Sequence, residues 1–152
     1  MALIKVCKPF AQLTPAELYD LLRLRSEVFV VEQQCVFLDM DNKDQQCYHL
    51  LLYQQGRLAA VARLLPAGLN YAETSIGRIV ASPVVRGTGL GKELVSAAIA
   101  ACYELFGAGP IKIGAQLYAK GFYETFGFVP VGEVYDEDGI DHIHMLKASP
   151  NE

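Results

Sequence analysis

The segment from residue 75 to residue 107, SIGRIVASPVVRGTGLGKELVSAAIAACYELFG, constrains the fold more than any other part of this chain. A β-branched run leads into an Arg-Gly-Thr-Gly-Leu-Gly loop, and an apolar-faced helical pattern follows at once. The first turn of such a helix leaves backbone N–H groups unpaired, and the positive end of its dipole favours an anion beside them. Gly87, Gly89 and Gly91 let a ligand come close to that backbone. The segment therefore predicts a strand–loop–helix unit that holds a pyrophosphate.

Two familiar glycine-rich motifs do not fit this loop. A dinucleotide-binding fingerprint needs glycines at its first, third and sixth positions, and counting from Gly87 the sixth position is Lys92. A P-loop needs a glycine five residues before its Gly-Lys-Ser/Thr, where this chain has Arg86, and a hydroxyl residue after the lysine, where it has Glu93. The loop instead matches the pattern Arg/Gln-x-x-Gly-x-Gly/Ala, directly after Ser-Pro.

A second motif lies about thirty residues further on, where residues 121–128 read GFYETFGF. The two motifs together resemble the acetyl-CoA loop and the Phe-Tyr-x-x-x-Gly-Phe run of the GCN5-related N-acetyltransferase (GNAT) superfamily. Residues 24–33, LRSEVFVVEQ, and residues 138–142, DGIDH, are similar to its ElaA-like branch. The order and spacing of these segments extend the resemblance over nearly the whole chain.

The resemblance implies a fold, a co-substrate and a reaction. The fold is a single α/β domain over residues 1–152, with a mixed, mostly antiparallel sheet whose central strands splay apart like a V, and with flanking helices. The reaction is direct transfer of an acetyl group from acetyl-CoA to a primary amine of a small molecule or protein. The pantetheine arm would pair with the strand before the loop, and the pyrophosphate would meet the loop itself. The cofactor-binding residues implied are Ile79, Val80, Ala81, Arg86, Gly87, Thr88, Gly89, Leu90, Gly91, Lys92 and Gln116, the last standing where many relatives carry Asn.

Tyr123 is the catalytic residue that the resemblance implies, because the tyrosine of this motif commonly lies near the cofactor sulfur. A phenol with a reference pKa near ~10 is still protonated at neutral pH and can protonate a departing thiolate. The competing interpretation is an aromatic side chain that simply packs a helix on the sheet.

The general base has several candidates: Glu27, Glu32, Glu73, His49 and His142. Glu32 is favoured because a carboxylate directly after the apolar residues 28–31 indicates pairing or a pocket, although a surface position at a helix end explains it equally well. His142 follows the turn of a predicted hairpin and either faces the acceptor or is a solvated ring. Arg78 lies on a strand and points either into the acceptor cleft or to solvent.

Composition indicates one compact domain, because 152 residues with 52% apolar side chains fill a single core. No apolar stretch approaches the roughly 20 residues of a membrane helix, and the first residues lack a signal peptide's basic region. We therefore expect a cytoplasmic protein. A net charge of −4 without a basic run argues against nucleic acid and membrane as partners and favours an amine. A homodimer is common among relatives and is the remaining expected partner.

Metal sites find no support in the sequence. The four cysteines contain no Cys-x-x-Cys pair and are expected to be reduced and mostly buried. A metal site drawn from Cys35, Cys47, His49, His142 and His144 would lack the usual zinc spacing. Residues 39–44, DMDNKD, hint at a calcium loop but lack its glycine and its final glutamate, so residues 39–46 are predicted to be a solvated loop.

The predicted elements follow from hydrophobic periodicity and turn residues. A Thr-Pro-Ala-Glu capping box starts a helix at Pro15, with helical spacing as far as Phe29. Strands are expected at residues 3–6, 49–54, 58–65, 74–81, 111–115, 128–136 and 141–147, and further helices at residues 92–106 and 117–126.

Two other functions remain open from the sequence. A loop that binds CoA does not require turnover, so a non-catalytic CoA-binding or regulatory module is one alternative. An acyltransferase with a longer acyl donor is the other, since the Arg-x-x-Val-Phe-Val-x-Glu stretch, residues 25–32, also resembles acyl-homoserine-lactone synthases.

Overall fold

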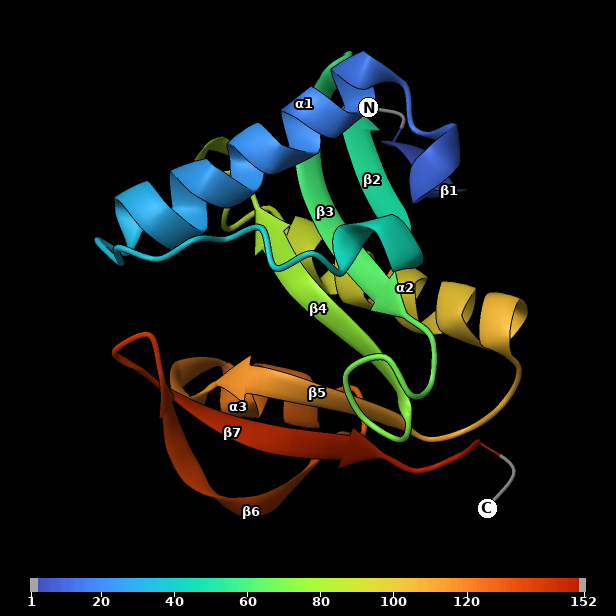
Figure 1. Cartoon of the computed structure of the whole chain (residues 1–152), viewed down its shortest axis with the longest axis vertical. Helices are drawn as coiled ribbons and strands as arrows, with labels where there is room; N and C mark the ends of the chain where they lie inside the picture. The colour runs from blue at the N-terminus through green and yellow to red at the C-terminus, as the bar shows by residue number, and fades with distance from the viewer. Residues whose placement is uncertain (1–2, 151–152) are drawn as a thin grey trace.

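The computed structural model describes residues 3–150, which form one seven-stranded sheet with helices on both faces (Figure 1). The strands are β1 (Leu3–Pro9), β2 (Tyr48–Gln54), β3 (Arg57–Leu65), β4 (Thr74–Ala81), β5 (Ile111–Gln116), β6 (Val129–Glu137) and β7 (Ile140–Lys147). The longer helices are α1 (Pro15–Arg25), the π-helix η2 (Ser26–Glu32), α2 (Leu90–Phe106) and α3 (Lys120–Glu124). Short 3-10 turns complete the chain: η1 (Phe10–Gln12), η3 (Asp44–Gln46), η4 (Pro83–Val85) and η5 (Leu117–Ala119).

The sheet has the order β1-β2-β3-β4-β5-β7-β6 and is antiparallel except between β4 and β5. These two central strands are parallel, and their pairing is confined to Thr74 with Ile111 and Ser75 with Lys112. Beyond these pairs the strands diverge, as Figure 1 shows toward its left side. The predicted V-shaped splay in a mixed, mostly antiparallel sheet is therefore confirmed.

The core has two layers because β2 and β3 are buried on both faces. Leu50 and Leu52 of β2 pack in the cluster that includes Leu94 and Ala98 of α2. Leu51, which points the opposite way, packs in a second cluster with residues of α1 and η2. Continuous apolar strands of this kind require a helix on each side, and α1 and α2 supply them.

The first helix begins as predicted and then changes type. Thr14 and Glu17 form both hydrogen bonds of a capping box ahead of Pro15. After Arg25 the helix widens into the π-helix η2, so the apolar spacing that predicted one helix as far as Phe29 spans two helical forms. Because π-helical turns are uncommon and often mark functional sites, the position of η2 beside the splayed strands is informative.

The loop of residues 39–46 is not solvated as a whole, and the prediction for it was wrong. Asp39 and Asp44 are both buried. They form ion pairs with arginines from three different elements. Arg25, with 1% of its surface exposed, reaches Asp39 at 2.8 Å and Asp44 at 2.9 Å. Arg63 and Arg78 complete the cluster, which we call the buried arginine–aspartate network.

The network includes one further carboxylate, Asp41. Arg63 donates to Asp41 at 2.8 Å and to Asp44 at 3.0 Å, and Arg78 Nε lies 2.8 Å from Asp39 Oδ1. Burial by itself raises the pKa of Asp44, but the hydrogen bonds from Arg25 and Arg63 outweigh it and hold the pKa below its usual range. The loop is thereby fixed against α1, β3 and β4 at one end of the splay.

Candidate active site

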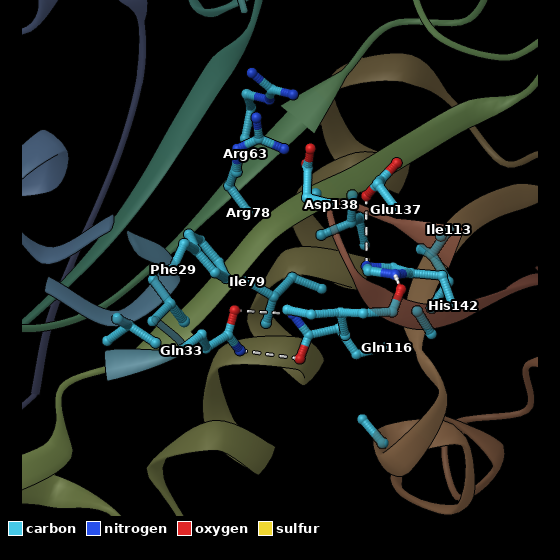
Figure 2. A pocket seen from close by; sticks show the side chains of 18 of the residues that line it. Phe29, Gln33, Arg63, Arg78, Ile79, Ile113, Gln116, Glu137, Asp138 and His142 are labelled. Carbon is cyan, nitrogen blue, oxygen red and sulfur yellow. Dashed lines mark hydrogen bonds and ion pairs between the residues drawn. The ribbon is translucent and has the colours of Figure 1, made fainter. Parts of the chain in front are cut away.

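A cavity of about 770 Å³ lies where β4 and β5 separate. Its walls come from the β4 segment Gly77–Ala81, the end of β5, η2 and the loop after it, and the β6–β7 hairpin (Figure 2). Beyond Ser75, no described strand pairs with the side of β4 that faces β5. The open N–H and C=O groups of Ile79, Val80 and Ala81 can therefore accept an extended, amide-rich ligand as a partner.

The glycine-rich loop follows β4 at one end of this cavity. Gly87 and Gly89 have φ angles of 82° and 84°, which only glycine adopts readily. Gly89 is the N-cap of α2, so the helix starts at Leu90, two residues before the predicted start, because Leu90 and Gly91 already have helical backbone. The strand–loop–helix unit predicted from the sequence is present, with an open helix N-terminus.

Arg86 and Glu32, both singled out from the sequence for other roles, form an ion pair with each other. The two guanidinium nitrogens of Arg86 donate to the two carboxylate oxygens of Glu32 at 2.6 Å each. This hydrogen bonding to Arg86 lowers the pKa of Glu32. A carboxylate with a lowered pKa is a weaker base, so the pair argues against Glu32 as the group that deprotonates an amine.

Gln116 is held by a residue that the sequence analysis did not single out. Its amide exchanges two hydrogen bonds with the amide of Gln33, at 3.1 and 3.3 Å, and Figure 2 shows the pair crossing the cavity. Cys35 makes a second contact across this region, where its thiol donates to the carbonyl oxygen of Asp138 at 2.9 Å. Residues 33–35 therefore connect the η2 side to β5 and to the β6–β7 turn.

Tyr123 lines the cavity and is also packed as a core aromatic. Its ring makes edge-to-face contacts with Phe122 and Phe128, with centroids 5.3 and 6.1 Å apart. Burial raises the pKa of its phenol well above the usual value, so the hydroxyl keeps its proton throughout the ordinary pH range. The packing interpretation from the sequence is confirmed by these ring contacts, and the residue also lines the cavity, so its catalytic role stays a prediction.

Arg78 faces the cavity because of an irregularity in β4. The pairing of β3 with β4 shifts between Val61 and Arg63, which leaves one extra residue in β4, and Arg78 has a φ angle of 47°. Such a bulge changes the direction of a side chain. Arg78 donates to the Asp39 carbonyl oxygen at 2.7 Å, so it belongs to the arginine–aspartate network as well as to the cavity wall.

His142 is buried on the opposite wall, in the β6–β7 hairpin. Its Nδ1 lies 2.7 Å from the carbonyl oxygen of Ile140, and its Nε2 lies 3.4 Å from Glu137 Oε2. Glu137 was not a candidate from the sequence, because its position beside His142 depends on the pairing of two strands.

The other base candidates lie elsewhere. His49 is buried beside the arginine–aspartate network, with Nε2 2.9 Å from the Asp44 carbonyl oxygen. Neither Glu27 nor Glu73 is among the described residues that line the cavity. Cys7 is exposed, the other three cysteines are buried, and all four are free, as expected.

Within residues 3–150, no three His, Cys, Asp or Glu side chains are grouped so that they could hold a metal ion. Over the same residues, no helix is both long enough and apolar enough to cross a membrane.

Comparison with known proteins agrees with this geometry. Residues 15–149 match the model of the acetyltransferase (GNAT) domain family. Protein ElaA of Escherichia coli is 40% identical over 139 residues, which cover 90% of this chain and 91% of that protein.

Solved structures give the same result. An acyl-CoA N-acyltransferase from Pseudomonas aeruginosa superimposes with a TM-score of 0.92 and 42% identity, over 97% of this chain and 100% of the other. The crystal structure of E. coli ElaA superimposes with a TM-score of 0.90 and 36% identity, over 96% and 99% of the two chains. The chain therefore belongs to the GNAT superfamily of N-acyltransferases, in its ElaA-like branch.

Proposed function

We propose that this protein transfers an acetyl group from acetyl-CoA directly to a primary amine of a small molecule or protein. The observation that carries the proposal is the cavity at the β4–β5 splay, which lies between an open glycine-rich loop and a buried tyrosine. The pantetheine arm would extend β4 at Ile79–Ala81, and the pyrophosphate would meet the N–H groups of Gly87–Gly91. The four free cysteines suit a reducing compartment such as the cytoplasm.

The proposed reaction needs a neutral amine and a proton for the departing sulfur. The amine nitrogen attacks the thioester carbonyl carbon, and the C–S bond breaks as the amide forms. Tyr123 donates its proton to the thiolate and regains one from the nitrogen of the product. Although burial raises the pKa of Tyr123, the thiolate leaves into the same buried space, which raises its basicity as well.

The Arg86–Glu32 pair gives a prediction for binding of the donor. Arg86→Glu is expected to weaken CoA binding by about 10- to 100-fold, because the phosphates lose a charge-assisted donor and meet a carboxylate. Glu32→Gln is expected to tighten it, by no more than about fivefold, because Glu32 competes for the same guanidinium. Calorimetric titration with CoA measures both changes.

Arg57→Glu is the matched control for this pair, because Arg57 is exposed at the start of β3 and does not line the cavity. It makes the same charge reversal and is expected to leave CoA affinity unchanged. Equal losses in Arg86→Glu and Arg57→Glu would show that the effect is general electrostatics and not a contact with phosphate.

Activity itself is tested by mass spectrometry of pooled amines after incubation with acetyl-CoA and the purified protein. The pool contains alkyl amines, amino acids, polyamines, aminosugars and lysine-bearing peptides. An acetylated product supports the proposal and identifies the acceptor class. No product above the enzyme-free control, from folded protein that binds CoA, would favour a CoA-binding module instead.

The length of the acyl donor is tested in the same assay. Acetyl-CoA and longer acyl-CoA thioesters are supplied separately with the amine pool. Preferred use of a long-chain donor would replace acetyl transfer with the long-acyl alternative that the sequence left open.

A further inference from the structure

The β6–β7 hairpin brings two proton-accepting groups together on the cavity wall. Tyr135 pairs with His142 across the hairpin, and Glu137 pairs with Ile140 next to the turn. His142 also pairs with Gln116 of β5, and directly paired residues point to the same face of a sheet. Figure 2 shows His142 beside Gln116, with Glu137 above the imidazole ring. The imidazole and the carboxylate therefore both face the space between the splayed strands.

Hydrogen bonding determines where the proton of His142 lies. A backbone carbonyl oxygen only accepts, so the 2.7 Å contact with Ile140 places a hydrogen on Nδ1. In the neutral ring the lone pair is then on Nε2. Glu137 Oε2 lies 3.4 Å from Nε2, a contact that is an ion pair only when the ring is protonated. With the neutral ring, two acceptors thus lie side by side.

The charges along the cavity support the same interpretation. Four carboxylates line it: Glu32, Asp41, Glu137 and Asp138. Arg86 forms an ion pair with Glu32, and Arg63 forms one with Asp41. Within residues 3–150, no arginine or lysine forms an ion pair with Glu137 or Asp138, so these two carboxylates give the hairpin end of the cavity its negative charge. A cation entering the cavity is attracted to that end.

We propose that His142 Nε2 and the Glu137 carboxylate form the acceptor site for a protonated primary amine, with His142 as the general base. This inference rests on the proposed acetyl transfer and adds to it the two residues that bind the protonated acceptor and remove its proton. The acceptor enters as an alkylammonium ion, which Glu137 attracts and whose N–H groups suit two adjacent acceptors.

The ammonium ion gives one proton to His142 Nε2, which leaves a neutral amine and an imidazolium ion. Glu137 and the Ile140 carbonyl oxygen stabilise that imidazolium, and the ring later releases its proton to solvent. The amine then attacks the thioester as above. The net products are the N-acetylated amine, CoA thiol and one proton.

Several titratable and charged groups lie near His142. The ring of Tyr135 lies 5.7 Å from it, and His144 follows two residues later on the same strand. Burial lowers the pKa of His144, and Lys112 lowers it further. The β5 residue opposite His142 is the uncharged Gln116, while Asp138 is in the turn and Arg78 is on the far wall.

The experiment compares two amines that differ mainly in basicity, ethylamine and trifluoroethylamine, together with the acceptors found in the pooled assay. Ethylamine is protonated at neutral pH, and trifluoroethylamine is mostly neutral. His142→Gln is expected to lower kcat/KM for protonated acceptors by at least about 100-fold, the usual contribution of a base, and to have a much smaller effect on the neutral amine. The same variant should also lose the fall of kcat/KM at acidic pH.

Glu137→Gln tests separately whether the carboxylate attracts the positively charged acceptor. We expect the KM of protonated amines to rise about tenfold, as for loss of a charge-assisted contact, with little change for trifluoroethylamine. Glu133→Gln is the matched control, since Glu133 is exposed on the same strand and does not line the cavity. His144→Gln controls for loss of a neighbouring imidazole, and any effect should be equal for both amines.

The outcomes separate this inference from the proposed function. If the wild-type protein acetylates no amine, both fail. If it acetylates amines but His142→Gln and Glu137→Gln lose activity equally toward protonated and neutral ones, acetyl transfer stands and the inference is overturned. Nitrogen NMR of the three histidines gives a readout without turnover. A neutral His142 protonated on Nε2 instead of Nδ1 would also overturn it.

Discussion

Tyr123→Phe is expected to lower kcat by about 100-fold or more, because the thiolate would leave without a positioned proton donor. The phenylalanine ring keeps the edge-to-face contacts with Phe122 and Phe128, so folding and CoA affinity should change little. Release of CoA thiol under saturating substrates measures kcat, and calorimetry measures CoA binding. Because burial raises the pKa of Tyr123, wild-type kcat should not fall through ionisation of this phenol below pH ~10.

Tyr103→Phe is the matched control for this variant. Tyr103 lies on α2, away from the described cavity lining, and its buried hydroxyl has no hydrogen-bond partner within residues 3–150. Removing that hydroxyl should leave kcat unchanged. If Tyr123→Phe has the same kcat as Tyr103→Phe, Tyr123 is not the proton donor and only packs α3 on the sheet.

Arg25→Met is expected to destabilise the fold by about 3–5 kcal/mol, because the buried Asp39 and Asp44 carboxylates each lose one of the two arginines that neutralise them. Arg25 contacts both Asp39 and Asp44, which fix the loop beside the cavity. Urea unfolding measures the change in free energy. Arg23→Met, on the exposed side of the same helix, should stay within about 0.5 kcal/mol of wild type. A similarly small change for Arg25→Met would show that the network contributes nothing to stability.

The pH dependence of this variant follows from the carboxylates. Hydrogen bonds from arginines lower the pKa of Asp44 against the opposing effect of burial, and Asp41 behaves in the same way. Groups with lowered pKa values stabilise the fold fully above their unfolded pKa of about 3.9 and lose that contribution as the pH falls further. The difference in stability between wild type and Arg25→Met should therefore shrink below pH ~4.

Local patterns predicted the elements accurately because each depends on neighbouring residues. Thr14 and Glu17 satisfy the N–H groups at the start of α1 across three positions, and the Gln55-Gly56 turn has the positive φ angles that a tight hairpin needs. The β4 strand has the predicted bounds of residues 74–81. The π-helix η2 could not be predicted in this way, because its apolar spacing is also compatible with an α-helix.

The candidate site was only partly predictable. Tyr123, Arg78, Gln116 and His142 were singled out from the sequence, and the structure brings them to one cavity. Their partners were not singled out, because Gln33 lies 83 residues from Gln116 and Asp39 lies 39 residues from Arg78. A local sequence pattern does not predict contacts between residues so far apart in the chain. The prediction of a solvated loop at residues 39–46 was wrong for the same reason, since polar loop residues are usually solvated and here Asp39 and Asp44 are buried in ion pairs with arginines from distant segments.

The strand–glycine loop–helix unit and, through two motifs and their spacing, the superfamily could be predicted from consecutive residues. These features depend on backbone conformation and periodicity, which are local properties of the chain. The pairing of charges, and which of them remain open to a ligand, became visible only in the folded molecule. Arg86 holds Glu32 and Arg63 holds Asp41, whereas Glu137 faces His142 without a cation. Coulomb energy depends on distance in space, and the folding of distant segments sets those distances.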